Sequence, residues 1–170
     1  VRRLSLIADA LSHVTLGGIS FGMFVVTVIP TLAFINPMWF GILYAVIGAL
    51  LIEKLRTSYS NYQEIAIPII MSAGIALSAI FISLADGFNQ EIVGLLFGSI
   101  SAVTLSDLIT IIVIVIIVLV FILSFYKELF ILSFDEEYSK VIGIPKWIQF
   151  IFIIIVAMVI SASMRVLGIL

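Results

Sequence analysis

Long apolar runs alternate with short polar segments along the whole chain. The apolar runs are roughly 20 residues long, which is the length that an α-helix needs to cross the hydrocarbon core of a bilayer. This pattern predicts five membrane-spanning helices, at about residues 4–29, 38–55, 65–84, 108–126 and 147–164. We therefore expect an all-α membrane protein built as one multi-span transmembrane helical bundle.

Residues 92–105, "IVGLLFGSISAVTL", form an apolar run that is too short to cross. Such a run predicts a re-entrant or interfacial helix, because irregular backbone is tolerated at membrane depth only where protein or a water-filled cavity surrounds it. Ser106 and Asp107 follow directly, and they predict the N-cap and the first turn of the fourth span.

The segment "LSFDEEYSKVIGIPKW" predicts a short cytoplasmic helix of about two turns within residues 133–145. Ser133 with Glu136 has the spacing of a capping box, while Gly143 and Pro145 are typical of a helix end. This helix is either an ordinary interfacial linker or a coupling helix that docks on a cytoplasmic partner. The residues that would carry the docking are Phe134, Asp135, Glu136, Glu137, Tyr138 and Gly143.

Composition and charge support a membrane protein and give its orientation. Of the 170 residues, 64% are hydrophobic and 11% are charged, whereas a soluble domain has about 45–50% apolar and about 25% charged residues. The positive-inside rule assigns the side with most basic residues to the cytoplasm. Arg165 is the exception in this topology, and the basic residues on the cytoplasmic side are Arg2, Arg3, Lys54, Arg56, Lys127, Lys140 and Lys146.

Several classes of function are excluded by what the sequence lacks. It has no cysteine, so disulfides and thiolate metal sites are ruled out. It contains no G-x-x-x-x-G-K-[ST] motif for ATP and, with a single histidine, no H-E-x-x-H protease site. We expect no catalytic site, no bound cofactor and no nucleic-acid partner. The chain starts with Val1 and stops within an apolar run, so we expect it to be an internal fragment of a longer protein of the cytoplasmic membrane.

Asp9 and His13 are the strongest candidates for a functional pair, because they lie four residues apart on one face of the first helix. His13 lies roughly 15 Å beyond Arg3 along the helix axis, near the middle of the membrane. An ionisable group at this depth normally pairs with another group or faces a pathway. Three alternatives remain: a mutual hydrogen bond, Asp9 in the headgroup layer, or a cation pathway.

A cation pathway fits the chemistry of the two side chains. Carboxylate oxygen and imidazole nitrogen are suitable ligands for Zn²⁺ and Mn²⁺, but two ligands cannot hold such an ion. A two-fold dimer that presents the same face twice would supply four.

Small residues and outer acidic residues add weaker signals. Pairs of small residues four apart predict close helix packing, within one subunit or in a dimer; the pairs are Gly18 and Gly22, Gly41 and Ala45, Gly94 and Gly98. Asp86, Glu91 and Asp107 lie on the outer side. They either form a mouth that attracts cations, with Asp86 and Asp107 as its candidates, or are solvated loop residues.

Three motifs resemble the permease subunit of the zinc/manganese (divalent metal) ABC importers, the ABC-3 type. "RRLSLIADALSH" is similar to the family's R-R-x-x-x-x-G-D-A-L-S-H stretch, although Ala8 stands where the family often has Gly. "LLFGSI" followed by "SD" is similar to its short helix before the next span, and "SFDEEYSKVIGIP" to its cytoplasmic loop. The order and spacing agree along essentially the whole chain.

The resemblance implies a fragment of a type II importer permease, with further helices on both sides of the chain. It implies a homodimer of permeases, cytoplasmic ATP-binding subunits, and an extracellular metal-binding protein. Asp9 and His13 match the family's intramembrane metal pathway, and residues 134–143 match the loop that docks on the ATPase. The expected cargo is a divalent metal ion, Zn²⁺ or Mn²⁺, moved by ATP-driven alternating access.

Two other functions remain open on the residues alone. Asp9 and His13 could be a proton relay in a proton-coupled secondary cation transporter, which needs no ATPase. The chain could also be a membrane anchor with structural duties, in which case apolar replacements of both residues leave function intact.

Overall fold

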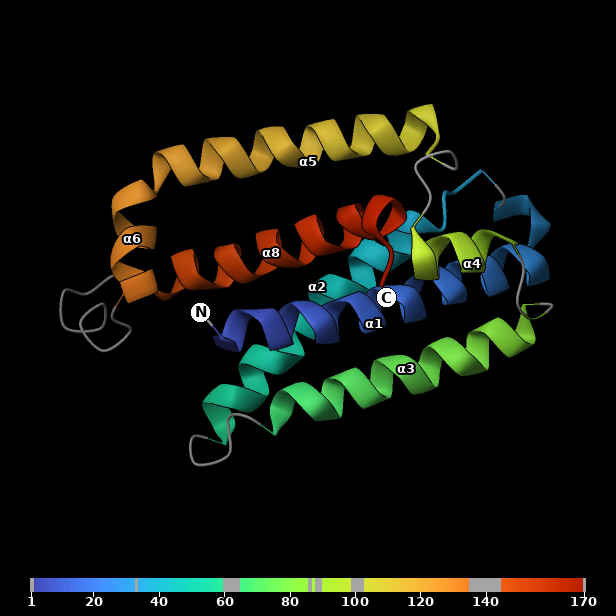
Figure 1. The fold of residues 1–170 in the computed structure, drawn as a ribbon, viewed down its shortest axis with the longest axis horizontal. Coiled ribbons are helices and arrows are strands. Elements are labelled where there is room, and N and C mark those ends of the chain that lie inside the picture. The colour runs from blue at the N-terminus through green and yellow to red at the C-terminus, as the bar shows by residue number, and fades with distance from the viewer. Residues whose placement is uncertain are drawn as a thin grey trace.

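The computed structural model of the chain is a bundle of α-helices (Figure 1). It describes residues 2–32, 34–59, 65–85, 87, 90–98, 103–134 and 145–169. Those residues contain no β-strand, so the predicted all-α membrane fold is confirmed. The helices are α1 (Arg2–Val28), the 3-10 helix η1 (Pro30–Leu32), α2 (Met38–Ser58), α3 (Ala66–Leu84), α4 (Gln90–Phe97), α5 (Leu105–Ser124), α6 (Tyr126–Phe134) and α8 (Lys146–Leu167).

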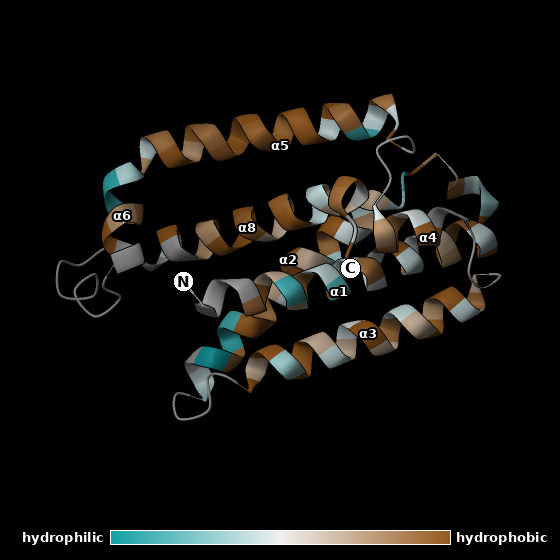
Figure 2. Cartoon of the chain, viewed as in Figure 1, coloured by the Kyte–Doolittle hydropathy of each residue, from teal (hydrophilic) through white to brown (hydrophobic). Residues whose placement is uncertain are grey.

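Four of these helices are long and apolar enough to cross a membrane, judged by length and composition within the described residues. They cover Leu6–Val28, Met38–Arg56, Ala66–Leu84 and Leu105–Ser124. Helix α8 occupies the fifth expected span and contains a shorter apolar stretch, Phe150–Met164. Figure 2 shows mostly brown, hydrophobic positions along α5 and α8 and a mixture of brown and pale positions along α3.

Helix α1 lies at the centre of the bundle and contacts α2, α3 and α8 (Figure 1). About 56% of its spanning part is buried, against 17% for α5, which packs against α8 and α6. The exposed face of α5 is almost wholly apolar and suits contact with lipid. The helix that carries the candidate pair is therefore the most enclosed of the spans.

Glycines set the spacing of the central helices. Gly18 of α1 packs on α2 so closely that an added Cβ would lie 2.6 Å from the Tyr44 Cβ and 2.9 Å from the Gly41 Cα. Gly48 and Gly74 receive the Val14 side chain from opposite sides, with an added Cβ 2.9 Å from its atoms in each case. The expectation that Gly18 and Gly41 serve close packing within one subunit is thus confirmed.

The short helix before the fourth span differs from the prediction in its length. Helix α4 begins at Gln90 and ends at Phe97, whereas the sequence pattern predicted a helix over 92–105. Gly98 follows with φ of 75°, a left-handed conformation that ends helices, and Thr104 is extended with ψ of 163°. The apolar composition of residues 92–105 gave no sign in the sequence that the helix ends before Gly98.

The start of the fourth span also needs correction. Thr104, not Ser106, is the N-cap of α5, and its hydroxyl accepts a hydrogen bond from the Asp107 backbone N–H. The Asp107 carboxylate in turn accepts from the Thr104 backbone N–H, which completes a capping box. Asp107 does lie in the first turn, as predicted, but the helix begins three residues earlier, at Leu105 rather than 108.

Helix α6 was missed by the sequence pattern, which ended the fourth span at about residue 126 and predicted the next helix within residues 133–145. Leu129 of α6 and Phe125, which precedes it, pack against a cluster that includes Phe121 of α5 and Ile148 of α8. Ser133 lies inside this helix, so its predicted role as an N-cap is wrong. Phe134 is the last residue of α6, and the other predicted coupling residues, Asp135, Glu136, Glu137, Tyr138 and Gly143, lie outside the described residues.

Candidate functional site

Asp9 and His13 face the same direction from α1, one helical turn apart. The His13 Nε2 and Asp9 Oδ1 atoms are 3.8 Å apart, which is an ion-pair distance but too long for a hydrogen bond. The His13 side chain is 22% exposed and the Asp9 side chain is 52% exposed. The alternative in which the two groups only satisfy each other by a hydrogen bond therefore does not describe this geometry, and both retain free ligand atoms.

The backbone around the pair is held firmly by its neighbours. The Ser78 hydroxyl of α3 donates to the Gly74 carbonyl oxygen at 2.7 Å and lies 3.3 Å from the His13 carbonyl oxygen. Val14, next in the chain, is wedged between the glycines of α2 and α3. The position of the His13 backbone is thus fixed by the packing of three helices.

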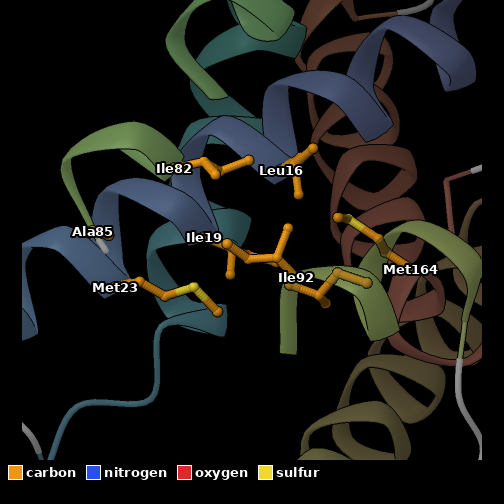
Figure 3. Close-up of a cluster of buried hydrophobic side chains, with 8 residues drawn as sticks. Leu16, Ile19, Met23, Ile82, Ala85, Ile92 and Met164 are labelled. Carbon is orange, nitrogen blue, oxygen red and sulfur yellow. The ribbon is translucent and has the colours of Figure 1, made fainter. Parts of the chain in front are cut away.

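The short helix α4 covers the outer half of the same face of α1. Leu16, Ile19 and Met23 pack there against Ile92 of α4 and Met164 of α8, as Figure 3 shows. Asp9 and His13 lie toward the N-terminal end of α1, before this apolar cluster begins. The pair consequently lies outside the segment of α1 that this cluster buries, and both side chains are partly exposed.

One chain offers an incomplete metal site. Within the described part of the chain, no group of three or more His, Asp or Glu side chains could hold a metal ion. An imidazole nitrogen and a carboxylate oxygen satisfy half of a four-coordinate site. A complete site therefore requires ligands from outside the described residues.

Asp107 is placed differently from the sequence-based expectations. Its side chain is fully buried, so the view of it as a solvated loop residue is wrong. Besides Thr104, it accepts a hydrogen bond from the Asn36 Nδ2 at 3.3 Å, which ties the loop before α2 to the start of α5. Asp86 and the Glu91 side chain lie outside the described residues, so the structure assembles no acidic outer mouth from the residues it describes.

Sequence reasoning overlooked Ser20, which lies on the same face as His13, seven residues further along α1. It is 1% exposed, and its hydroxyl has no hydrogen-bond partner among the described residues. The helical spacing of Asp9, His13 and Ser20 could have revealed it, but serine in an apolar helix is common enough to hide the signal.

Comparison with known proteins agrees with this architecture. A family model described as the ABC 3 transport family matches residues 1–170. The chain is 31% identical to a probable metal transport system membrane protein of Chlamydia pneumoniae, with 99% of this chain and 57% of the relative covered. It is 30% identical to the manganese transport system membrane protein MntC of Listeria monocytogenes, with 99% and 58% covered.

A solved structure has the same fold. PsaBC from Streptococcus pneumoniae in complex with Fab superposes with a TM-score of 0.75 at 26% identity, over 97% of this chain and 57% of that chain. The chain thus spans less than two thirds of the length of the relatives that it matches. Since the family model covers the whole chain and the three motifs, the helices and the solved structure agree, this protein belongs to the ABC 3 transport family.

Proposed function

We propose that the chain is the core of a membrane permease subunit that imports a divalent metal ion, Zn²⁺ or Mn²⁺, across the cytoplasmic membrane by ATP-driven alternating access. The observation that carries the proposal is the Asp9–His13 pair, with a 3.8 Å separation, partial exposure and a rigidly packed backbone. Manganese is the ion named for the Listeria relative.

The pair suits cargo that must bind and then leave. Two ligands on each of two permeases would give four around a two-fold axis, enough for borderline divalent cations. Partial exposure of Asp9 limits its desolvation and keeps binding weak enough for release. We propose a homodimer in which the faces bearing Asp9 and His13 oppose each other.

The ATP-binding subunits would act on the permease at the end of the bundle that carries α6. Helix α6 lies across the ends of α5 and α8 (Figure 1), and Phe125 contacts Trp147 edge to face at a centroid distance of 5.3 Å. We infer that cytoplasmic ATP-binding subunits push on the segment after Phe134 and that α6 transmits this push to α5 and α8. An extracellular metal-binding protein would deliver the ion at the opposite end.

Uptake of ⁵⁴Mn²⁺ and ⁶⁵Zn²⁺ by the full-length permease, reconstituted with its ATPase in proteoliposomes, tests the proposal. Asp9→Asn and His13→Gln should each lower transport about thirtyfold, because each removes one of the two ligand groups that the chain offers the ion, and a loss of about 2 kcal/mol in binding corresponds to this factor. Glu53→Gln is the matched control, because it makes the same change in charge at a carboxylate that pairs with Arg56 near the end of α2.

Three outcomes would contradict the proposal. Wild-type uptake in both pathway variants would remove Asp9 and His13 from the pathway. Uptake that a protonophore abolishes and that continues without ATP would favour a proton-coupled carrier, with the same pair as a proton relay. Full function after simultaneous replacement of both residues by leucine would favour a structural anchor.

A further inference from the structure

Ser20 lies on the stripe of α1 that leads outward from His13. Asp9, His13 and Ser20 lie on the same face of α1, because four residues make about one helical turn and seven make almost two. The axial distance from His13 to Ser20 is roughly 10 Å. A route to His13 along this face from the expected outer side would pass the Ser20 hydroxyl.

The Ser20 hydroxyl behaves unlike most hydroxyls of the spanning helices. Usually such a group bonds to a carbonyl of its own helix one turn earlier, as the Thr15 Oγ1 does with the Leu11 carbonyl oxygen at 2.7 Å. The same pattern holds for the hydroxyls of Thr27, Ser78, Thr110 and Ser163. Ser20 is buried to 1% exposure yet makes no such bond within the described structure.

The surroundings of Ser20 make an unpaired hydroxyl unfavourable. Its neighbours in the chain, Ile19 and Phe21, are apolar, and Ile19 belongs to the buried cluster that includes Ile92 of α4. A buried hydroxyl without a partner costs free energy that an alanine would avoid. Ser161 of α8 is a second buried hydroxyl in this state, on the helix that packs beside Leu16.

We propose that Ser20 is a binding step of the cation pathway, at which the hydroxyl oxygen replaces part of the water around a divalent cation before the ion reaches Asp9 and His13. Hydroxyl oxygen is a neutral, hard ligand, which suits a partly hydrated Mn²⁺ or Zn²⁺ without trapping it. This inference rests on the proposed function of the pair. It adds a residue on the same helix, about two turns outward of His13.

Cysteine substitution offers a direct test, because the described chain contains no cysteine. Ser20→Cys is made in the full-length permease, with any cysteine elsewhere replaced, and reconstituted with the ATPase. A cationic methanethiosulfonate reagent is added from the outer side, and ⁵⁴Mn²⁺ uptake is followed. Thr15→Cys is the matched control, since Thr15 is 0% exposed on the same helix and its hydroxyl is already bonded.

The proposal predicts that the reagent inactivates Ser20→Cys about tenfold faster than Thr15→Cys, because thiol reactivity follows access to water. Mn²⁺ alone should slow the inactivation of Ser20→Cys. In a parallel assay, Ser20→Ala should reduce uptake about fivefold, the value of one lost hydrogen bond to the hydrated ion. Membrane levels of all variants are measured to normalise uptake.

Equal and slow inactivation of the two cysteine variants would overturn the proposal, as would wild-type uptake by Ser20→Ala. Failure to insert Ser20→Ala leaves the cysteine comparison as the deciding measurement. The two proposals fail separately: if Asp9→Asn and His13→Gln block uptake while Ser20 variants do not differ from their controls, only the role of Ser20 is refuted.

Discussion

Replacing Gly18 by alanine adds one methyl group at the closest approach of α1 and α2. The new Cβ would lie 2.6 Å from both the Phe40 carbonyl oxygen and the Tyr44 Cβ. Ordinary contact between such atoms is about 3.5–4.0 Å, so the two helices must separate by about 1 Å. Overpacking of this kind costs about 1–3 kcal/mol, of which the better helix propensity of alanine recovers about 1 kcal/mol.

Gly17→Ala provides a matched control one residue earlier. There the added Cβ would meet the Gly74 carbonyl oxygen at 3.3 Å and the Ser78 Oγ at 3.4 Å, so adjustments of a few tenths of an ångström are sufficient. The gain in helix propensity is the same in both variants. Gly17→Ala should therefore be neutral or slightly stabilising, while Gly18→Ala should lower the free energy of unfolding by up to about 2 kcal/mol.

The assay is thermal unfolding of the full-length permease in detergent, combined with ⁵⁴Mn²⁺ uptake in proteoliposomes. Gly18→Ala should lower the unfolding midpoint and also reduce uptake, because a shift of α1 against α2 displaces the Asp9–His13 face. Equal unfolding midpoints for the Gly17 and Gly18 variants would refute the reasoning, since only the distances to neighbouring atoms distinguish them.

Four further substitutions test other contacts. Gly98 has a φ of 75°, and a Cβ added there would lie 2.6 Å from a carbonyl oxygen of α8, so Gly98→Ala should accelerate hydrogen exchange in α4. Gly87 has a φ of 82° but no atom within 4 Å of an added Cβ, so Gly87→Ala should lower the free energy of unfolding by only about 1–2 kcal/mol and leave the amides of α4 protected. Asp107→Ala should lower the free energy of unfolding by about 1–2 kcal/mol through loss of the capping box, and an unchanged midpoint would show the cap to be dispensable. Glu53→Gln should cost less than about 1 kcal/mol, because the pair with Arg56 at 3.7 Å is only partly buried; a larger loss by chemical denaturation would indicate a stronger network.

The spanning helices could be predicted from the sequence because lipid imposes one requirement on every span. Hydrogen bonds within a helix must satisfy the whole backbone, so an apolar run of sufficient length predicts a helix directly. The pair on α1 could also be predicted, since an i, i+4 spacing of Asp9 and His13 places both on one face. Their separation by 3.8 Å without a hydrogen bond required coordinates.

The errors arose where tertiary packing overrides local signals. Ser106 and Thr104 are both good N-caps, and the choice of Thr104 depends on a carboxylate that also binds Asn36, 71 residues earlier in the chain. Helix α6 forms because Phe125 and Leu129 find an apolar cluster on α5 and α8. Neither partner can be identified from the segment itself.

The insertion of Val14 between Gly48 and Gly74 has a mechanical consequence. Because Val14 is held by contacts on two helices, α1 resists both sliding and rotation against α2 and α3. The three helices should therefore move as one rigid block during any transport cycle. Such a block would carry the acid and the imidazole together, without changing the gap between them. Relative movement between helices would then occur mainly where packing is sparse, at α5 and the attached α6, rather than within this block.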